Sequence, residues 1–290
     1  MKVSYNEACT LHNSDLETDL RLAEEIGFSH IEMRLDKLQE YLRTHTLEDL
    51  KAFFQKSRIR PHAINGIYTY TEFLGEEDDP ERAQALLADI KFCCEVCVAV
   101  GSKDLIMVPP IFQEAEERPY TDPWEKILRD NVRIFKKMAD FVAPYGVRIG
   151  IEIVGAPRCS IRTIEQCNKV LQLVDKPNVG YTLDAFNLYL YSKNNDFSEI
   201  QNADASRIFV VHINGGEEGE LKDLRQSYRT FCDRGVMNVE NYLQNLKSVG
   251  YDGPVSIEFF RKDCWERPAR DVIQECYRTT KAVMQKCNTL

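Results

Sequence analysis

Four residues of metal-binding type stand at the ends of apolar, β-branched runs in the second half of the chain. They are Glu152 in GIEIVG, Asp184 in GYTLDAF, His212 in VVHING and Glu258 in VSIEFF. Three carboxylates packed together would repel one another and raise one another's pKa values unless a cation neutralised them. We therefore predict one divalent metal ion at these four residues. Oxygen-rich ligation with one nitrogen suits Mn²⁺, Mg²⁺ or Co²⁺, and Zn²⁺ stays open.

Such a site predicts proton-transfer chemistry on a ketose or keto-polyol. A hydroxy-ketone could chelate the ion through two oxygens, and polarisation of its carbonyl would acidify the adjacent C–H bond. Glu152 and Glu258 could then move a proton between neighbouring carbons through an enediolate, which is an isomerase or epimerase reaction. A single strand-end glutamate or histidine is usually structural, so the prediction depends on all four residues together.

The elements that would position these residues are eight apolar runs that alternate with helical stretches. The runs lie near Val3, Ile31, Ile59, Ile106, Ile149, Val179, Val210 and Val255. Strands that alternate with helices form parallel βα units, and eight such units close a barrel. We predict a single α/β domain over residues 1–290, a (β/α)8 TIM barrel with its active site at the carboxyl ends of the strands.

The helical stretches between the runs have recognisable ends. Ser14 or Asp15 can cap the first stretch, and Gly27 suits a left-handed stop. Thr46 can cap the next stretch, and Gly250 can end the last helix before the eighth run.

Further polar residues follow the first three runs and predict contacts with substrate hydroxyls. They are Asn6, Glu7, Glu32, Arg34 and Asn65. For Glu32 and Arg34 an ion pair at the barrel rim is an equal alternative.

Another residue, Arg229, follows the seventh run and could reach over the mouth of the barrel to bind substrate. The protein surface is the commoner place for an arginine.

Composition narrows the class of protein. The formal charge of −9 argues against a nucleic-acid partner, and no apolar run approaches the roughly 20 residues of a membrane span. Ten scattered cysteines and a strand-like opening without a signal segment predict a reducing cytoplasm. Cys94 and Cys97 form a CxxC without a second cysteine pair, which predicts plain helix packing.

Long stretches of the sequence resemble the xylose isomerase-like family of sugar isomerases and epimerases, and within it the inosose isomerases of myo-inositol catabolism. The similar segments are SYNEACTLHNSDLETDLRLAEEIGFSHIEMR, DKLQEYLRTHTLEDLKAFF, APYGVRIGIEIVG, NVGYTLDAF and PVSIEFFR. The resemblance implies a xylose isomerase-like TIM barrel and a metal at the four residues named above. It also implies Glu152 and Glu258 as the proton-transfer pair, a keto-inositol substrate and a homodimer.

This chain departs from the family pattern at three places near the predicted site. Asn187 stands where the family has a substrate-binding histidine, so we expect Asn187 to bind substrate. Ala156 replaces another histidine of the inosose isomerase pattern, and the loop around Arg229 keeps Gly235 but lacks a proline-glycine turn. Asparagine can hydrogen-bond a hydroxyl but cannot carry a proton near neutral pH.

Three alternatives stay open at this point. A keto-polyol dehydratase would use the same enolate and expel a β-hydroxyl. An abasic-site endonuclease shares the barrel but needs a histidine-rich three-zinc site, and the chain has five histidines, of which His212 alone falls on a predicted metal position. A non-catalytic binding protein would not need its carboxylates intact.

Overall fold

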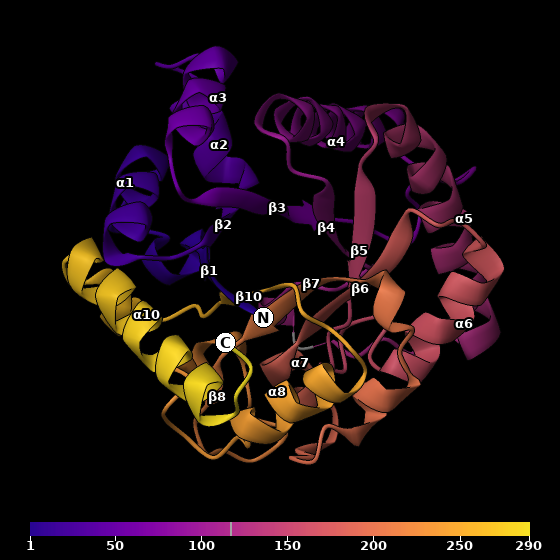
Figure 1. The fold of residues 1–290 in the computed structure, drawn as a ribbon. Coiled ribbons are helices and arrows are strands. Elements are labelled where there is room, and N and C mark those ends of the chain that lie inside the picture. Colours follow the sequence, from indigo (N-terminus) through magenta and orange to yellow (C-terminus); the bar gives the residue numbers. More distant parts are fainter. Residues whose placement is uncertain (117) are drawn as a thin grey trace.

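The computed structural model describes residues 1–116 and 118–290, and its main strands close into a parallel barrel (Figure 1). The barrel strands are β1 (Lys2–Asn6), β2 (His30–Arg34), β3 (Arg60–Tyr68), β4 (Asp104–Val108), β5 (Arg148–Glu152), β6 (Val179–Asp184), β7 (Ile208–Ile213) and β10 (Pro254–Ile257). Their order around the barrel is β1, β10, β7, β6, β5, β4, β3, β2. Each of the eight apolar runs forms one of these strands, which confirms the predicted TIM barrel.

Helices surround the barrel on the outside, as Figure 1 shows. They are α1 (Leu16–Ile26), α2 (Leu35–Tyr41), α3 (Leu47–Lys56), α4 (Pro80–Val100), α5 (Trp124–Val142), α6 (Ile164–Val174), α7 (Ala185–Ser192), α8 (Val239–Ser248), α9 (Lys262–Trp265) and α10 (Ala269–Lys286). Short 3-10 turns are η1 (Glu7–Thr10), η2 (Glu114–Glu116), η3 (Ala143–Tyr145), η4 (Ser198–Asn202), η5 (Ala205–Arg207) and η6 (Gln226–Tyr228). A two-stranded antiparallel sheet pairs β8 (Gly215–Gly216) with β9 (Arg229–Thr230) in the loop after β7. Within residues 1–116 and 118–290, no helix combines the length and apolar character needed to cross a membrane.

The predicted helix ends are observed. Asp15 caps α1 by accepting a hydrogen bond from the Thr18 amide, and Gly27 ends that helix with a φ of 113°. Thr46 caps α3 in a reciprocal capping box with Asp49, which satisfies two amide groups that the helix cannot. The glycine after α8, Gly250, also has a positive φ, of 93°. Local sequence therefore sets where these helices begin and end.

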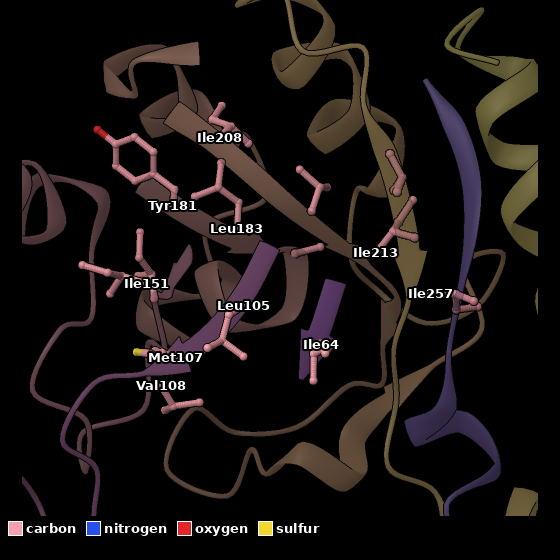
Figure 2. Close-up of a cluster of buried hydrophobic side chains, with 14 of the residues drawn as sticks. Ile64, Leu105, Met107, Val108, Ile151, Tyr181, Leu183, Ile208, Ile213 and Ile257 are labelled. Atoms are coloured by element: carbon pink, nitrogen blue, oxygen red, sulfur yellow. The ribbon is translucent and has the colours of Figure 1, made fainter. Parts of the chain in front are cut away.

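Alternation of side chains along the strands separates the core from the site. Ile151, Leu183 and Ile257 are buried in the large apolar cluster that also contains helix residues, and Figure 2 shows them among its members. Successive side chains of a strand point to opposite faces. The residues that follow these three along the chain, Glu152, Asp184 and Glu258, therefore point into the barrel. Burying each large aliphatic side chain stabilises the fold by roughly 1.5–3 kcal/mol, which holds the polar partners in place.

The cysteines lie in the apolar interior. Cys94 and Cys97 are buried in α4, and burial raises the pKa of each thiol to about 12. Such thiols stay protonated at neutral pH and are poor nucleophiles and metal ligands. The structure thus confirms helix packing as the role of this CxxC.

Candidate active site and metal centre

The four predicted metal ligands lie at the carboxyl ends of four consecutive strands of the barrel and are all buried. Glu152 and Asp184 end β5 and β6, His212 lies one residue before the end of β7, and Glu258 follows β10 directly. Asp184 and His212 are paired in the β6–β7 register. In the neighbouring registers Glu152 is paired with Thr182 and His212 with Ser256, so the four residues share the carboxyl end of the barrel but only Asp184 and His212 are direct partners.

A cavity of about 270 Å³ opens at this end of the barrel, with both Glu152 and Glu258 in its wall. Its other lining residues are Asn65, Tyr68, Val108, Ile111, Glu114, Val154, Arg158, Asn187, Gln226, Arg229 and Phe260. A larger hollow of about 540 Å³ lies outside the barrel between α6 and α7 and contains none of the predicted site residues. We take the smaller cavity as the candidate active site because Glu152 and Glu258 line it, whereas Asp184 and His212 lie behind its wall.

The imidazole of His212 lies between carboxylates on both sides. Its Nε2 is 3.0 and 3.1 Å from the two carboxylate oxygens of Glu32. Its Nδ1 is 3.2 Å from Glu258 Oε2 and 3.8 Å from Asp184 Oδ2. Among residues 1–116 and 118–290, this nitrogen has no hydrogen-bond partner. A neutral ring that donates from Nε2 to Glu32 would direct its Nδ1 lone pair toward Asp184 and Glu258.

Electrostatics favour a proton on this ring until a cation replaces it. Burial by itself would lower the pKa of His212, but the carboxylates of Glu258 and Glu32 outweigh burial and raise that pKa well above its ordinary value. A metal ligand must release its proton, so a proton and a metal ion compete for Nδ1.

The donor set fits a divalent ion. Glu32, His212 and Glu258 each offer one ligand atom within 4.8 Å of the others. Metal–ligand bonds of about 2.0–2.2 Å place neighbouring donors roughly 3–3.5 Å apart, a spacing that the 3.2 Å between His212 Nδ1 and Glu258 Oε2 matches. Asp184 Oδ2, at 3.8 Å from the same nitrogen, lies slightly outside that spacing. The buried Nδ1 of His212, which has no hydrogen-bond partner among the described residues and lies beside carboxylate oxygens, is therefore suited to bind a metal ion.

Arg229 lies inside the site. It is not on the protein surface, where most arginines lie. Its side chain is 1% exposed, and Nη1 donates to Asp184 Oδ2 at 2.9 Å and to Glu258 Oε2 at 2.6 Å. The guanidinium also lines the cavity. One internal cation thus offsets part of the negative charge of the carboxylates.

Two asparagines hold the carboxylates of Glu32 and Glu258 in place. Asn6 and Asn65 each donate from Nδ2 to Oε1 of both Glu32 and Glu258. Asn65 also lines the cavity, as the prediction of substrate binding requires. The ion pair between Glu32 and Arg34, left as an equal alternative by the sequence, does not form, because Glu32 is buried against Asn6 and Asn65 and Arg34 pairs with Asp36 at 2.9 Å.

The two cavity glutamates differ in how many donors they accept. Glu258 accepts from Asn6 and Asn65 at Oε1 and from Arg229 at Oε2. Burial would raise the pKa of Glu258, but the cations of His212 and Arg229 outweigh it and lower that pKa well below its ordinary range.

Glu152 has a different environment. Its Oε1 accepts a hydrogen bond from Asn187 Nδ2 at 2.9 Å. Burial, reinforced by the charge of Glu258, raises the pKa of Glu152 to about 8. Two carboxyl groups whose pKa values are pushed apart are typical of an acid–base site.

Glu7 does not line the cavity, although we expected it to bind substrate. It is the first residue of η1 and is buried there, where Oε2 accepts from the Arg34 amide at 2.8 Å and Oε1 is 3.8 Å from Lys37 Nζ. Asn6, the residue before it, takes the inward position that alternation allows.

Gln226, in η6 of the loop after β7, is a wall residue that the sequence did not indicate. Its Nε2 donates to Asn187 Oδ1 at 3.2 Å, and the cavity is lined by both residues. Asn187 therefore lies at the cavity, as expected, but its amide already contacts Glu152 and Gln226. No periodic pattern marks η6, and a long-range contact positions it, so no sequence signal could have singled out Gln226.

Comparison with known proteins places this barrel in a defined group. Residues 20–281 match the family model of the xylose isomerase-like TIM barrel. The chain is 33% identical over 287 residues to an inosose isomerase of Bacillus subtilis strain 168, covering 99% of each protein. It is 31% identical over 287 residues to an inosose isomerase of Bacillus velezensis, covering 99% of this chain and 98% of that one. A crystal structure of the IolI protein with a bound zinc atom superposes with a TM-score of 0.90 at 32% identity, with both chains fully covered.

Proposed function

The chain belongs to the xylose isomerase-like TIM barrel family, and from that premise we propose that it is a metal-dependent isomerase of inosose-like keto-polyols. The observation that carries this proposal is a pair of buried glutamates, Glu152 and Glu258, that share one cavity while their pKa values are shifted in opposite directions. The inosose isomerases among the relatives support the substrate class.

We propose Glu152, Asp184, His212 and Glu258 as the ligands of one divalent ion. Glu32 has a candidate ligand oxygen near His212, but both of its oxygens face Nε2, on the side of the ring away from Asp184 and Glu258. Glu32 then orients the imidazole from behind, as carboxylates behind metal-bound histidines commonly do. The zinc atom in the IolI crystal structure supports a metal in this fold, and the donors here accept Mn²⁺, Mg²⁺, Co²⁺ or Zn²⁺.

When bound, the ion would polarise the substrate carbonyl and so acidify the neighbouring C–H bond. The rest of the work falls to side chains of this chain. Glu152 has few competing donors, so an oxygen is free to take a proton from one carbon and to return it to the next. Glu258 would face the substrate from the other side as the second carboxylate of the pair. Arg229 would stabilise negative charge that develops on an enediolate oxygen.

The proposal is tested by following protons in D₂O. The purified protein is loaded with Mn²⁺ and mixed with a panel of inososes and ketohexoses, and the products are analysed by NMR. The proposal predicts isomerised product that carries solvent deuterium and has lost no water. Loss of water would indicate a dehydratase on the same site. Absence of exchange across the panel would refute the proposal.

A further inference from the structure

Gln226 has a side-chain oxygen that is buried at the cavity and lacks a donor. Within the part of the chain that the structure describes, no hydrogen-bond partner reaches Gln226 Oε1. A buried acceptor without a partner destabilises a folded protein, because it has lost its hydrogen bonds to water and gained none in exchange. Gln226 lines the cavity, so a ligand bound there could supply the missing donor.

The orientation of the Gln226 amide follows from the chemistry of its neighbours. The carboxylate of Glu152 accepts hydrogen bonds, so Asn187 must present its Nδ2 to Glu152, at 2.9 Å. The Oδ1 of Asn187 then faces Gln226, which must present Nε2, at 3.2 Å. This chain of donors leaves Oε1 as the group that Gln226 offers to a ligand.

The backbone of Gln226 is held across the mouth of the cavity. Its amide lies 3.4 Å from Glu114 Oε1 in η2, and Glu114 is itself 4.0 Å from Arg158 Nη2. All three residues line the cavity. The loop that carries Gln226 is therefore tied to the loop after β4, which fixes the height of the free oxygen above the site.

We propose that Gln226 is a specificity residue, whose Oε1 accepts a hydrogen bond from one hydroxyl of the substrate. Asn187 acts as a positioning residue that links Gln226 to Glu152, and Gln226 contributes more than Asn187 to substrate recognition. The ligand is a polyol in which one hydroxyl next to the reacting carbons points toward η6. The inference rests on the proposed isomerase function and adds a residue that discriminates among its substrates.

The test pairs a variant with a set of substrate analogues. The Mn²⁺-loaded wild type, Gln226→Met and the matched neighbour control Ser227→Ala are assayed with an inosose and its monodeoxy analogues. Ser227 is exposed in the same turn. The readouts are kcat/KM for deuterium exchange and calorimetric affinity for each compound.

In the wild type, one monodeoxy analogue should lose roughly ten- to hundredfold in affinity and in kcat/KM, because the oxygen is then left unpaired. Gln226→Met should abolish the discrimination against that analogue alone, while Ser227→Ala should retain it. A purely structural role would instead weaken every compound equally.

Equal discrimination by wild type and Gln226→Met would overturn the assignment of Gln226 and leave the proposed function standing. A wild type that neither binds nor exchanges any inosose or ketohexose would overturn both. The two failures are thus distinguishable.

Discussion

Two buried acidic clusters lie near the ends of the barrel strands, and they balance their charge in different ways. The cavity cluster consists of Glu152, Asp184, His212 and Glu258, with Arg229 as its internal cation. The sealed cluster consists of Glu7 of η1 together with Asp19 and Lys37, where Lys37 Nζ is 2.6 Å from Asp19 Oδ2 and 3.1 Å from the Thr10 carbonyl oxygen.

The sealed cluster contains its own lysine, which pairs with Asp19 at 2.6 Å, and none of its three residues lines the cavity. The cavity cluster has more carboxylates than its single guanidinium can neutralise. Each cluster holds one glutamate whose pKa burial raises to about 8, Glu7 in one and Glu152 in the other. A raised pKa therefore does not by itself identify a catalytic residue, and access to the cavity makes the difference.

Matched substitutions of Glu152 and Glu7 should show the largest difference between the two clusters. Glu152→Gln should lower substrate deuterium exchange roughly 10²–10⁴-fold, since it removes the proton carrier. Glu7→Gln should change exchange by no more than about threefold, because Glu7 lies outside the cavity. NMR in D₂O measures both rates, and circular dichroism checks that both variants fold. Similar losses in the two variants would contradict the comparison.

Removal of the sealed cation should affect stability and not chemistry. Lys37→Met leaves Asp19 buried without its partner and should lower the free energy of unfolding by about 3–5 kcal/mol. Urea denaturation measures the change. The double variant with Asp19→Asn should recover much of the loss, and a lack of recovery would show that Lys37 does not act through Asp19.

The pH dependence of stability should carry the signature of Glu7. The pKa of this carboxyl is raised from 4.5 to about 8, so between these values the folded state binds more protons than the unfolded state. The free energy of unfolding contributed by Glu7 therefore falls as pH rises through that window. Relative to wild type, the free energy of unfolding of Glu7→Gln should rise by up to about 2–3 kcal/mol between pH 5 and pH 7. Parallel curves for the two metal-loaded proteins would contradict the raised pKa.

Glu32 sharpens the comparison from the metal side. Glu32→Gln keeps the shape of the side chain but weakens the contact that orients His212, and should weaken Mn²⁺ binding roughly 10–100-fold. Asp36→Asn, which alters an exposed pair with Arg34, should leave the affinity unchanged. Calorimetric titration distinguishes the two variants. Unchanged Mn²⁺ affinity in Glu32→Gln would show that Glu32 does not support the metal site.

Much of the fold could be predicted from sequence because strand periodicity and helix caps are local signals. Glu152, Asp184, His212 and Glu258 could be located together because each stands at the end of an apolar run, where alternation makes it point inward.

The remaining parts of the site depend on contacts that the sequence does not encode locally. Glu32 pairs with a residue 180 positions away, and Gln226 is positioned by Asn187 and Glu114 across the mouth. Glu7 is sealed because the chain turns into η1 directly after β1. The direction of side chains at strand ends, more than residue type, decides which of the predicted residues line the cavity.

The central claim is that the cavity cluster holds one divalent ion through Glu152, Asp184, Glu258 and the Nδ1 of His212. Anomalous diffraction at the manganese edge, from crystals soaked in Mn²⁺, tests it directly. The account predicts a single strong peak between Asp184, Glu258 and Nδ1, within bonding distance of Glu152. A peak on the Glu32 side of the ring, or a site without anomalous signal after soaking, would contradict it.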